Sequence, residues 1–261
     1  MSTSAEPGVA LNDDIKFDPS DPTRAPMISW FCEWQAPGGT KLQLDAPDRR
    51  ALVSLLSKCS GLTEGHILTP TPAHDPYYAD MSGSPCLVLQ LNFAALHPLE
   101  SGLKTTGHLA MLASHRFLPS LANAVISHQA FLSRQFPVPD PKIISSDGSA
   151  LTYLVEYPGP ASDVNAWHSF YVSHHPPLMT QLPAIRCVEI YTPAVVICEL
   201  PFSSRAAMQR NKTVFDSAEA MNAAMLSPVR EEMRRDFRNF PAFGGGNTHY
   251  PFHTMTVRGA L

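Results

Sequence analysis

Residues 163–179 are predicted to form a helix whose side chains could carry out acid–base chemistry. Trp167, Tyr171 and His175 recur at every fourth position and therefore share one face of a helix. A histidine has an ordinary pKa of about 6.5, so it can accept or release a proton near neutral pH. A tyrosine hydroxyl one turn away could donate a hydrogen bond to a developing enolate or phenolate oxygen. We therefore predict His175 as the catalytic base or acid and Tyr171 as its oxyanion-stabilising partner.

A purely structural role for this helix is the alternative. In that case Trp167 and Tyr171 are core residues. His168 and His174 are then solvated, and His175 caps the last carbonyl groups of a helix that the following proline stops. If the helix instead faces a pocket, Trp167, His168 and His174 are candidates for substrate binding.

A second set of polar residues follows three consecutive glycines near the end of the chain. If residues 249–255 form a strand, His249 and His253 share one face and Tyr250 lies on the other. We predict these three side chains as further substrate-binding residues.

Imidazoles also bind metals, so a metal or haem site is another possibility for the same histidines. Its ligands would be His174, His175, His249 and His253. However, residues four apart on a strand are about 13 Å apart, which is too far for both to bind one ion. We therefore predict no metal and no cofactor.

The composition predicts a globular protein without nucleic-acid or membrane partners. The chain has 261 residues, 44% of them hydrophobic and 16% charged, enough for one large domain or two small ones. The net charge is −4 and the basic residues are scattered along the chain, so we expect no basic patch that could bind the phosphate backbone of a nucleic acid. No segment approaches the roughly 18 uninterrupted apolar residues of a membrane span, and the N-terminus lacks the basic-then-apolar order of a signal peptide. We expect a cytoplasmic protein whose five cysteines are free thiols, since none has Cys-x-x-Cys spacing.

The chain contains an internal repeat. Strand-like segments at 28–34 and 151–157 both end in glutamate and an aromatic residue, and apolar segments at 86–93 and 195–202 occupy later corresponding places. In the second half we predict strand, helix, strand, strand, helix and strand at 150–157, 163–179, 184–192, 194–201, 217–237 and 251–258. The first half is expected to follow the same order with a weaker pattern.

This order describes a ferredoxin-like unit, an antiparallel sheet with helices on one face. Two such sheets can pack face to face. We therefore predict an α+β fold in which two tandem ferredoxin-like domains form a pseudo-dimeric α+β barrel with a pocket in its interior. The expected divisions are an extended arm at 1–26, a degenerate domain at 27–132, a linker at 133–149 and the domain with the site at 150–261.

Polar residues at two strand ends and in one loop are further candidates. Glu33 and Glu156 end equivalent strands, where we expect them to be solvated beside a lysine or arginine, although a carboxylate at a barrel mouth could accept a proton. His74 and Asp75, in a proline-rich loop, could reach the pocket from above.

The second half resembles the EthD domain family of dimeric α+β barrel proteins over about residues 150–258. The matching motifs occur in order: Tyr171, His175 and Pro177-Leu178, then Leu-Pro-Ala-Ile-Arg at 182–186, Phe-Asp-Ser at 215–217, a helix that runs to Ser227-Pro228, and Asp-Phe-Arg-Asn-Phe at 236–240. The first half shares only the topology and lacks the His-Pro turn, so one complete site per chain is expected. Asp236 matches the family's aspartate, which implies that it orients a histidine; a salt bridge at a helix end is the alternative.

The resemblance implies small, usually cofactor-independent enzymes or accessory proteins for aromatic, lactone or polyketide-like compounds. We accordingly predict a cofactor-independent lyase, isomerase, cyclase or decarboxylase that applies histidine acid–base chemistry to such a hydrophobic small molecule. A non-catalytic carrier of a flat apolar ligand, and a haem- or metal-dependent enzyme on the same fold, are the alternatives. The tandem repeat allows a pseudo-dimeric monomer and does not exclude a homodimer.

Overall fold

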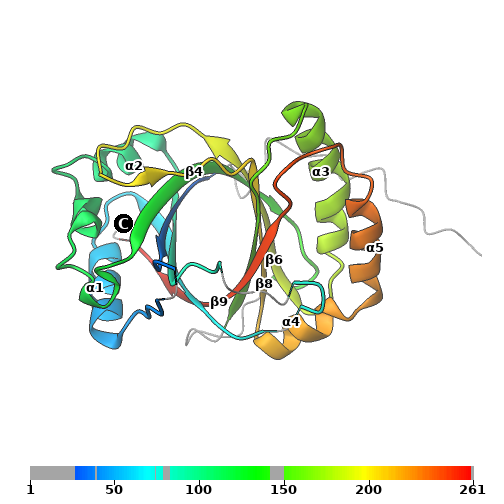
Figure 1. The fold of residues 1–261 in the computed structure, drawn as a ribbon, viewed down its shortest axis with the longest axis horizontal. Coiled ribbons are helices and arrows are strands. Elements are labelled where there is room, and N and C mark those ends of the chain that lie inside the picture. The colour runs from blue at the N-terminus through cyan, green and yellow to red at the C-terminus, as the bar shows by residue number, and fades with distance from the viewer. Residues whose placement is uncertain (1–26, 39, 74, 79–82, 142–149, 260–261) are drawn as a thin grey trace, which may run out of the picture.

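A computed structural model of the chain describes residues 27–259 except 39, 74, 79–82 and 142–149 (Figure 1). The predicted arm at 1–26, His74 and residues 142–149 of the predicted linker lie outside the described residues.

Two similar units follow one another along the chain. The first contains β1 (Ile28–Gln35), α1 (Ala46–Leu56), β2 (Leu62–Pro70), β3 (Leu87–Phe93), α2 (Leu96–Gly102), the 3-10 helices η2 (His108–Ala113) and η3 (Pro119–Leu121), and β4 (Val125–Phe136). The second contains β5 (Leu151–Tyr157), α3 (Val164–Met179), β6 (Ile185–Ala194), the short β7 (Ser203–Ser204), β8 (Gln209–Phe215), α4 (Ala218–Met225), α5 (Pro228–Phe237) and β9 (Thr248–Val257).

The sheets of the two units join into one closed barrel. Its strand order is β1-β3-β2-β9-β5-β8-β6-β4, and β4 pairs back with β1, so these eight strands form a ring (Figure 1). The units meet at β2–β9, where Ile67 is opposite Met255, and at β4–β6, where Leu132 is opposite Thr192. The predicted α+β fold, two ferredoxin-like units in one pseudo-dimeric barrel, is confirmed.

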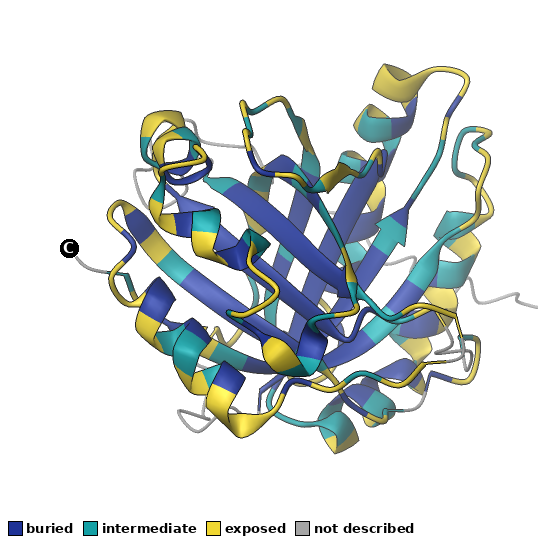
Figure 2. Ribbon diagram, turned by 60° about the vertical axis from the view of Figure 1, so that its left-hand side comes forward, coloured by how far each residue is buried: buried dark blue, intermediate teal, exposed yellow. Residues whose placement is uncertain are grey.

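The helices cover the outside of this barrel (Figure 1). Figure 2 shows that each helix turns an exposed side to the solvent, whereas the strands beneath are buried. In the first unit, the outward residues of the sheet and the inner face of α1 form one apolar core that includes Trp30, Leu52 and Leu89. In the second unit, Trp167 on α3 packs in a core with Val188 of β6.

The barrel interior is filled by side chains, so the expected pocket inside the barrel is wrong. Apolar residues of both units occupy much of it, among them Phe31, Val88, Phe131, Leu154, Tyr191 and Phe252. The interior also holds charged side chains, and a small cavity of about 60 Å³ lies beside Glu33 and Glu156. This packing follows from the two opposed sheets, whose inward residues interdigitate as in other sheet-on-sheet interfaces.

Glu33 and Glu156 are not solvated at the strand ends as expected. Both point into the barrel and share two arginines: Arg210 forms ion pairs with both glutamates, and so does Arg205. The Arg210 guanidinium, with a side chain 1% exposed, also lies 5.0 Å from the centre of the Phe31 ring. Two carboxylates and two guanidinium groups therefore balance their charges where water is largely excluded.

The helix predicted at 163–179 is confirmed as α3, which continues through Pro176 and Pro177, so the alternative in which the proline after His175 stops the helix is wrong. A proline in a helix removes one hydrogen bond and crowds a carbonyl group of the preceding turn, but its fixed φ suits a helix, and here the last turn still forms. Three other predicted segments differ from the structure. The helix predicted at 217–237 is two helices, α4 and α5, with a break before Pro228, which occupies the first turn of α5.

The strand predicted at 194–201 is also wrong. The strand β6 ends at Ala194, and residues 195–202 belong to no strand. The strand that completes the unit is instead β8, which was missed because its sequence, Gln-Arg-Asn-Lys-Thr-Val-Phe, lacks alternation of apolar and polar residues. In addition, β4 continues to Phe136, so the first four residues of the segment predicted as a linker are strand.

Among the described residues, none of the helices combines the length and the apolar character that crossing a membrane requires.

Candidate active site

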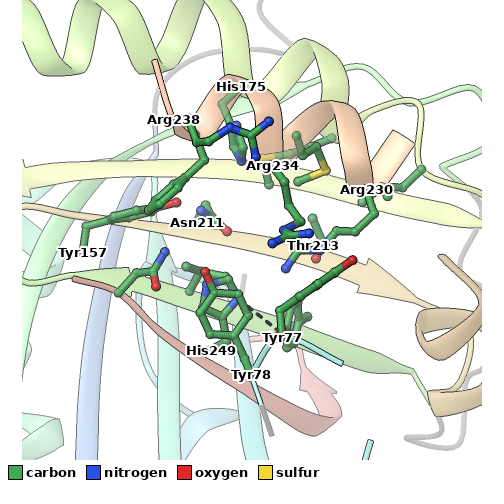
Figure 3. Close-up of a pocket in the computed structure, with 17 residues that line it drawn as sticks. Tyr77, Tyr78, Tyr157, His175, Asn211, Thr213, Arg230, Arg234, Arg238 and His249 are labelled. Atoms are coloured by element: carbon green, nitrogen blue, oxygen red, sulfur yellow. Dashed lines mark hydrogen bonds between the residues drawn. The ribbon is translucent and has the colours of Figure 1, made fainter. Parts of the chain in front are cut away.

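A cavity of about 410 Å³ lies between the sheet of the second unit and its helices, on the outside of the barrel (Figure 3). Strands β5, β8 and β9 form one wall, α3 and α5 form the opposite wall, and the loop after β2 contributes two tyrosines. The lining residues are Tyr77, Tyr78, Tyr153, Val155, Tyr157, His175, Met179, Leu182, Asn211, Thr213, Arg230, Met233, Arg234, Phe237, Arg238, Asn247 and His249.

His175 reaches this cavity from the fourth turn of α3. The helix begins at Asp163, whose carboxylate accepts a hydrogen bond from the backbone N–H of Ala166. From that start, Trp167, Tyr171 and His175 fall on the buried face at successive turns, as the sequence spacing predicts. His175 is 5% exposed and lines the cavity.

Asp236 on α5 holds the imidazole of His175 in place. His175 Nδ1 lies 2.7 Å from Asp236 Oδ2, and both side chains are largely buried. Burial lowers the pKa of His175, and the Asp236 carboxylate opposes this change. In the neutral imidazole, Nδ1–H therefore donates to the carboxylate and Nε2 carries the free lone pair. A neutral base oriented by a buried carboxylate is the arrangement that general acid–base catalysis needs.

Tyr171 lies one layer behind the cavity wall. It is fully buried and does not line the cavity. Its hydroxyl accepts a hydrogen bond from Asn211 Nδ2 at 2.6 Å, and burial raises the pKa of Tyr171 well above its ordinary value. Tyr171 thus positions Asn211, which does line the cavity. The hydroxyl of Tyr171 itself does not border the cavity, so the predicted direct contact with a ligand is not supported.

A second set of hydrogen-bonded polar side chains borders the cavity on the side of the sheet. Tyr153 on β5 donates its hydroxyl hydrogen to Asp75 Oδ2 at 2.7 Å, and Arg230 on α5 forms an ion pair with the same oxygen at 2.9 Å. His249 on β9 contacts Tyr153 through Nδ1 at 3.1 Å. The ring of Tyr78 stacks on the imidazole of His249 with 3.5 Å between centroids. The loop containing Asp75 therefore does reach the site, as its proline-rich sequence suggested.

Arginines make the helix side of the cavity cationic. Arg230, Arg234 and Arg238 occur at every fourth position of α5 and of the turn that follows it, and all three line the cavity. The Arg234 guanidinium lies over the ring of Tyr77, 3.8 Å from its centre. Arg230 is paired with Asp75, and Arg234 lies 3.4 Å from the exposed Glu231, so the charge of these arginines is partly compensated. Their guanidinium groups, with that of Arg238, still offer hydrogen-bond donors to an anionic ligand.

The other predicted substrate-binding residues do not line this cavity. Trp167 is fully buried in the aromatic core. His168 Nε2 contacts the backbone oxygen of Met208 at 3.1 Å, and the exposed His174 contacts that of Phe170 at 2.8 Å.

The two other candidates on β9, Tyr250 and His253, do not line this cavity either. His253 is exposed. Tyr250 lines the small cavity inside the barrel, because alternate residues of a strand face opposite sides. Within the described part of the chain, no group of three or more His, Cys, Asp or Glu side chains is arranged to hold a metal ion.

Sequence reasoning missed most of the polar lining. Tyr153 lay inside a correctly predicted strand, but its partner Asp75 is 78 residues away, a pairing that no local pattern reveals. Asn211 and Thr213 lie on the strand that was missed. The available signal for Arg230, Arg234 and Arg238 is their spacing of four, which indicates a shared helix face but not that this face borders a cavity.

Comparisons with known proteins agree on the fold. No protein-family model and no curated protein matches the chain. Among solved structures, a monooxygenase-like protein of Fusobacterium nucleatum is similar with a TM-score of 0.57 and 8% identity, covering 90% of this chain and 95% of its own. An anthrone oxidase-like protein is similar with a TM-score of 0.54 and 12% identity, covering 90% of this chain and 93% of its own.

An EthD family protein of Bacillus halodurans is matched only weakly. It covers 37% of this chain and 98% of its own, at 16% identity and a TM-score of 0.30. The chain thus shares the α+β barrel fold of the first two of these solved structures, and it builds the barrel from two units of a single chain.

Proposed function

We propose that this chain is an enzyme in which His175 transfers protons to and from a flat, hydrophobic acid or hydroxyaromatic compound bound in the outer cavity of the second unit. The observation that carries this proposal is the buried pair of His175 and Asp236 at the wall of a cavity. A buried histidine–aspartate pair also occurs in structural networks, but here the imidazole borders a space large enough for a small molecule.

Each polar residue has a separate role in the proposed reaction. His175 Nε2 removes a proton from an acidic C–H or O–H of the substrate, and Asp236 stabilises the imidazolium that forms. The resulting enolate or phenolate carries negative charge, which Arg234 and Arg238 stabilise from the helix side. Return of the proton at another atom gives isomerisation, whereas loss of a leaving group or of carbon dioxide from the anion gives a lyase or decarboxylase reaction.

The walls of the cavity suit a flat ring system. Tyrosine rings from the loop and from β5, together with Met179 and Leu182, supply apolar surface, while the polar groups come from α3, α5, β8 and the β9 side. One fold neighbour is named an anthrone oxidase-like protein, and an anthrone is an aromatic ketone whose enolisation requires a base. This substrate class therefore agrees with the proposed proton transfer.

Hydrogen–deuterium exchange tests the proposal before the product is known. A panel of hydroxyaromatic, lactone and β-keto acids is incubated with the protein in deuterated water, and deuterium uptake at carbon is followed by NMR. We expect exchange with at least one compound, and a loss of about 100-fold in His175→Gln, because positioned acid–base groups contribute factors of about 10² to 10⁴.

His174→Gln is the matched control. His174 precedes His175 on the same helix but is exposed, so its replacement should leave exchange unchanged. Exchange that survives in His175→Gln would contradict the role of His175. Tight binding of a compound by the wild-type protein without exchange or turnover would instead favour a carrier.

A further inference from the structure

His249 brings a second imidazole into the cavity, from the wall opposite to α3 (Figure 3). Its side chain is nearly inaccessible, with 6% exposure, and it lies between the ring of Tyr78 and the hydroxyl of Tyr153. Its environment differs from that of His175, because Nδ1 contacts a phenol and not a carboxylate. The two imidazoles are therefore suited to different tasks.

The hydrogen bonds around Tyr153 assign the proton of His249. Asp75 forms an ion pair with Arg230, so its carboxylate can only accept, and the single hydroxyl hydrogen of Tyr153 is donated to it. The Tyr153 oxygen must then accept the hydrogen bond from His249, which places the hydrogen of the imidazole on Nδ1. Consequently His249 Nε2 carries a lone pair and no hydrogen.

That lone pair has no hydrogen-bond partner within the described residues, although the Nε2 atom is buried. An unsatisfied buried acceptor is costly and uncommon in folded proteins, so it calls for an explanation. His249 lines the cavity, where a bound molecule can supply the missing donor. Arg230 Nε, a donor that also belongs to a lining residue, is likewise buried without a partner in the described part of the chain.

We propose that His249 is a specificity residue that accepts a hydrogen bond from a neutral hydroxyl group of the substrate. This inference rests on the proposed function and narrows its substrate class to hydroxylated aromatic acids. The anionic group of such a compound lies toward the arginines of α5, and its hydroxyl lies toward β9. A site that holds an unpaired buried acceptor selects strongly against an analogue that lacks the matching donor.

The electrostatics keep His249 in this neutral accepting form. Burial lowers its pKa well below the ordinary value, and the positive charge of Arg230 lowers it further. His249 therefore does not compete with His175 for the substrate's proton at neutral pH. Catalytic proton transfer and hydroxyl recognition are thus assigned to two separate imidazoles.

Three related probes test this assignment by isothermal titration: 6-hydroxy-2-naphthoic acid, 6-methoxy-2-naphthoic acid and 2-naphthoic acid. Only the first can donate a hydrogen bond from the position distant from its carboxylate. We expect the wild-type protein to bind it about 10-fold more tightly than the other two, as one buried hydrogen bond provides. In His249→Phe, which keeps a ring beneath Tyr78, this preference should disappear while the affinity for 2-naphthoic acid is retained.

His253→Phe is the matched control, because His253 lies on the same strand but is exposed. It should keep the hydroxyl preference. If His249→Phe does not fold, His249→Gln serves in its place, and a weaker preference is expected because glutamine is flexible and lacks the Nδ1–H that Tyr153 holds in place. A hydroxyl preference that is absent in the wild-type protein, or that persists in the His249 variant, would overturn the assignment.

The proton position can be measured without any ligand. Nitrogen-15 NMR of the imidazole distinguishes the two neutral forms, and we expect the Nδ1–H form for His249. In Tyr153→Phe the acceptor for that hydrogen is removed, so the Nε2–H form should become populated and the hydroxyl preference should fall. Observation of the Nε2–H form in the wild-type protein would also overturn the assignment.

The outcomes separate this inference from the proposed function. If none of the three probes binds, the aromatic-acid ligand class is wrong and both proposals fail. If all three bind equally, the assignment of His249 fails alone. If the hydroxyl preference is found but no compound undergoes exchange or turnover, His249 recognises a ligand in a protein that is a carrier.

Discussion

Replacing Asp236 with asparagine tests the acid–base pair most directly. The His175 Nδ1–H donates to Asp236 Oδ2 at 2.7 Å, with side-chain exposures of 7% and 11% for the two residues. Asparagine has the same shape and offers a carbonyl oxygen in the same place, so the hydrogen bond can persist while the negative charge is lost. Because that charge opposes the effect of burial on His175, the pKa of His175 should fall further below its ordinary value.

The size of this change follows from two estimates. A hydrogen bond to a charged group contributes about 1.5 to 3 kcal/mol and a neutral one about 0.5 to 1.5 kcal/mol, a difference equivalent to about one pKa unit. Coulomb's law at an effective dielectric constant of about 20 gives an attraction of about 6 kcal/mol at the observed 2.7 Å, an upper bound that relaxation and water entry reduce. We therefore expect Asp236→Asn to lower the pKa of His175 further, because the imidazolium loses at least about 1 kcal/mol of stabilisation.

An NMR titration of the histidine ring signals measures this pKa directly. Glu232→Gln is the control, since it removes one negative charge from the same helix at an exposed position paired with Arg235 at 3.9 Å. Once a substrate is in hand, the weaker base should reduce kcat/KM at neutral pH by about 10- to 100-fold. The acid limb of the pH profile should move to lower pH, because the base is active only when unprotonated. An unchanged or raised pKa of His175 in Asp236→Asn would refute this account of the pair.

Two further predictions concern stability. Arg210→Met removes the buried one of the two arginines shared by Glu33 and Glu156 and leaves them only the partly exposed Arg205, so it should lower the free energy of unfolding in urea by about 3 to 5 kcal/mol. Adding glutamine at both glutamate positions should recover part of this loss, and no recovery would contradict the ion-pair explanation. Burial lowers the pKa of His249 and of His175, so below a pH of about 6.5 the unfolded chain binds more protons than the folded chain. The free energy of unfolding therefore decreases as the pH is lowered through this range. His249→Gln should reduce this slope by up to about 1.4 kcal/mol per pH unit, and an unchanged slope would show that His249 does not contribute.

The sequence was most informative where the chemistry depends on local spacing. The recurrence of Trp167, Tyr171 and His175 every fourth residue predicted a helix and its buried face, because the helical period alone decides which side chains align. The contact of Asp236 with His175 spans 61 residues and was implied by a matching motif, not by periodicity. Strong local signals of this kind also sufficed for the alternation of strands and helices that defines the fold.

Local spacing could not locate the pocket. Strand β8 alternates between Arg210 and Lys212, which point into the barrel, and Asn211 and Thr213, which face the helices. Both sets are polar, so the strand shows no apolar face, and its stability depends on partners such as Glu189, 2.7 Å from Lys212. A sequence pattern indicates a buried face of a strand only when the residues on that face are apolar. On β8, one face forms ion pairs and hydrogen bonds with residues distant in the sequence, and the other face borders the cavity.

The same contrast accounts for the difference between the two units. In the first unit, outward residues such as Trp30 and Leu89 belong to one apolar core with Leu52 of α1, and the space between sheet and helix is filled with apolar side chains. In the second unit, Tyr153 and Asn211 occupy the equivalent layer beneath α5, where several helical positions are arginines and not leucines. Such groups cannot close that layer without burying polar atoms that lack partners, so a cavity that admits water or a ligand satisfies them at lower cost.

The barrel interior allows the second unit to keep that opening. A sheet that packs loosely against its own helices needs support on its other face, and here the support comes from the first unit. Arg210 and Lys212 extend from β8 across the barrel to Glu33 on β1 and Gln90 on β3, so the strand that carries Asn211 toward the cavity is anchored from behind. The first unit, which lacks the histidine helix, therefore serves as the rigid base on which the polar groups of the site keep their positions.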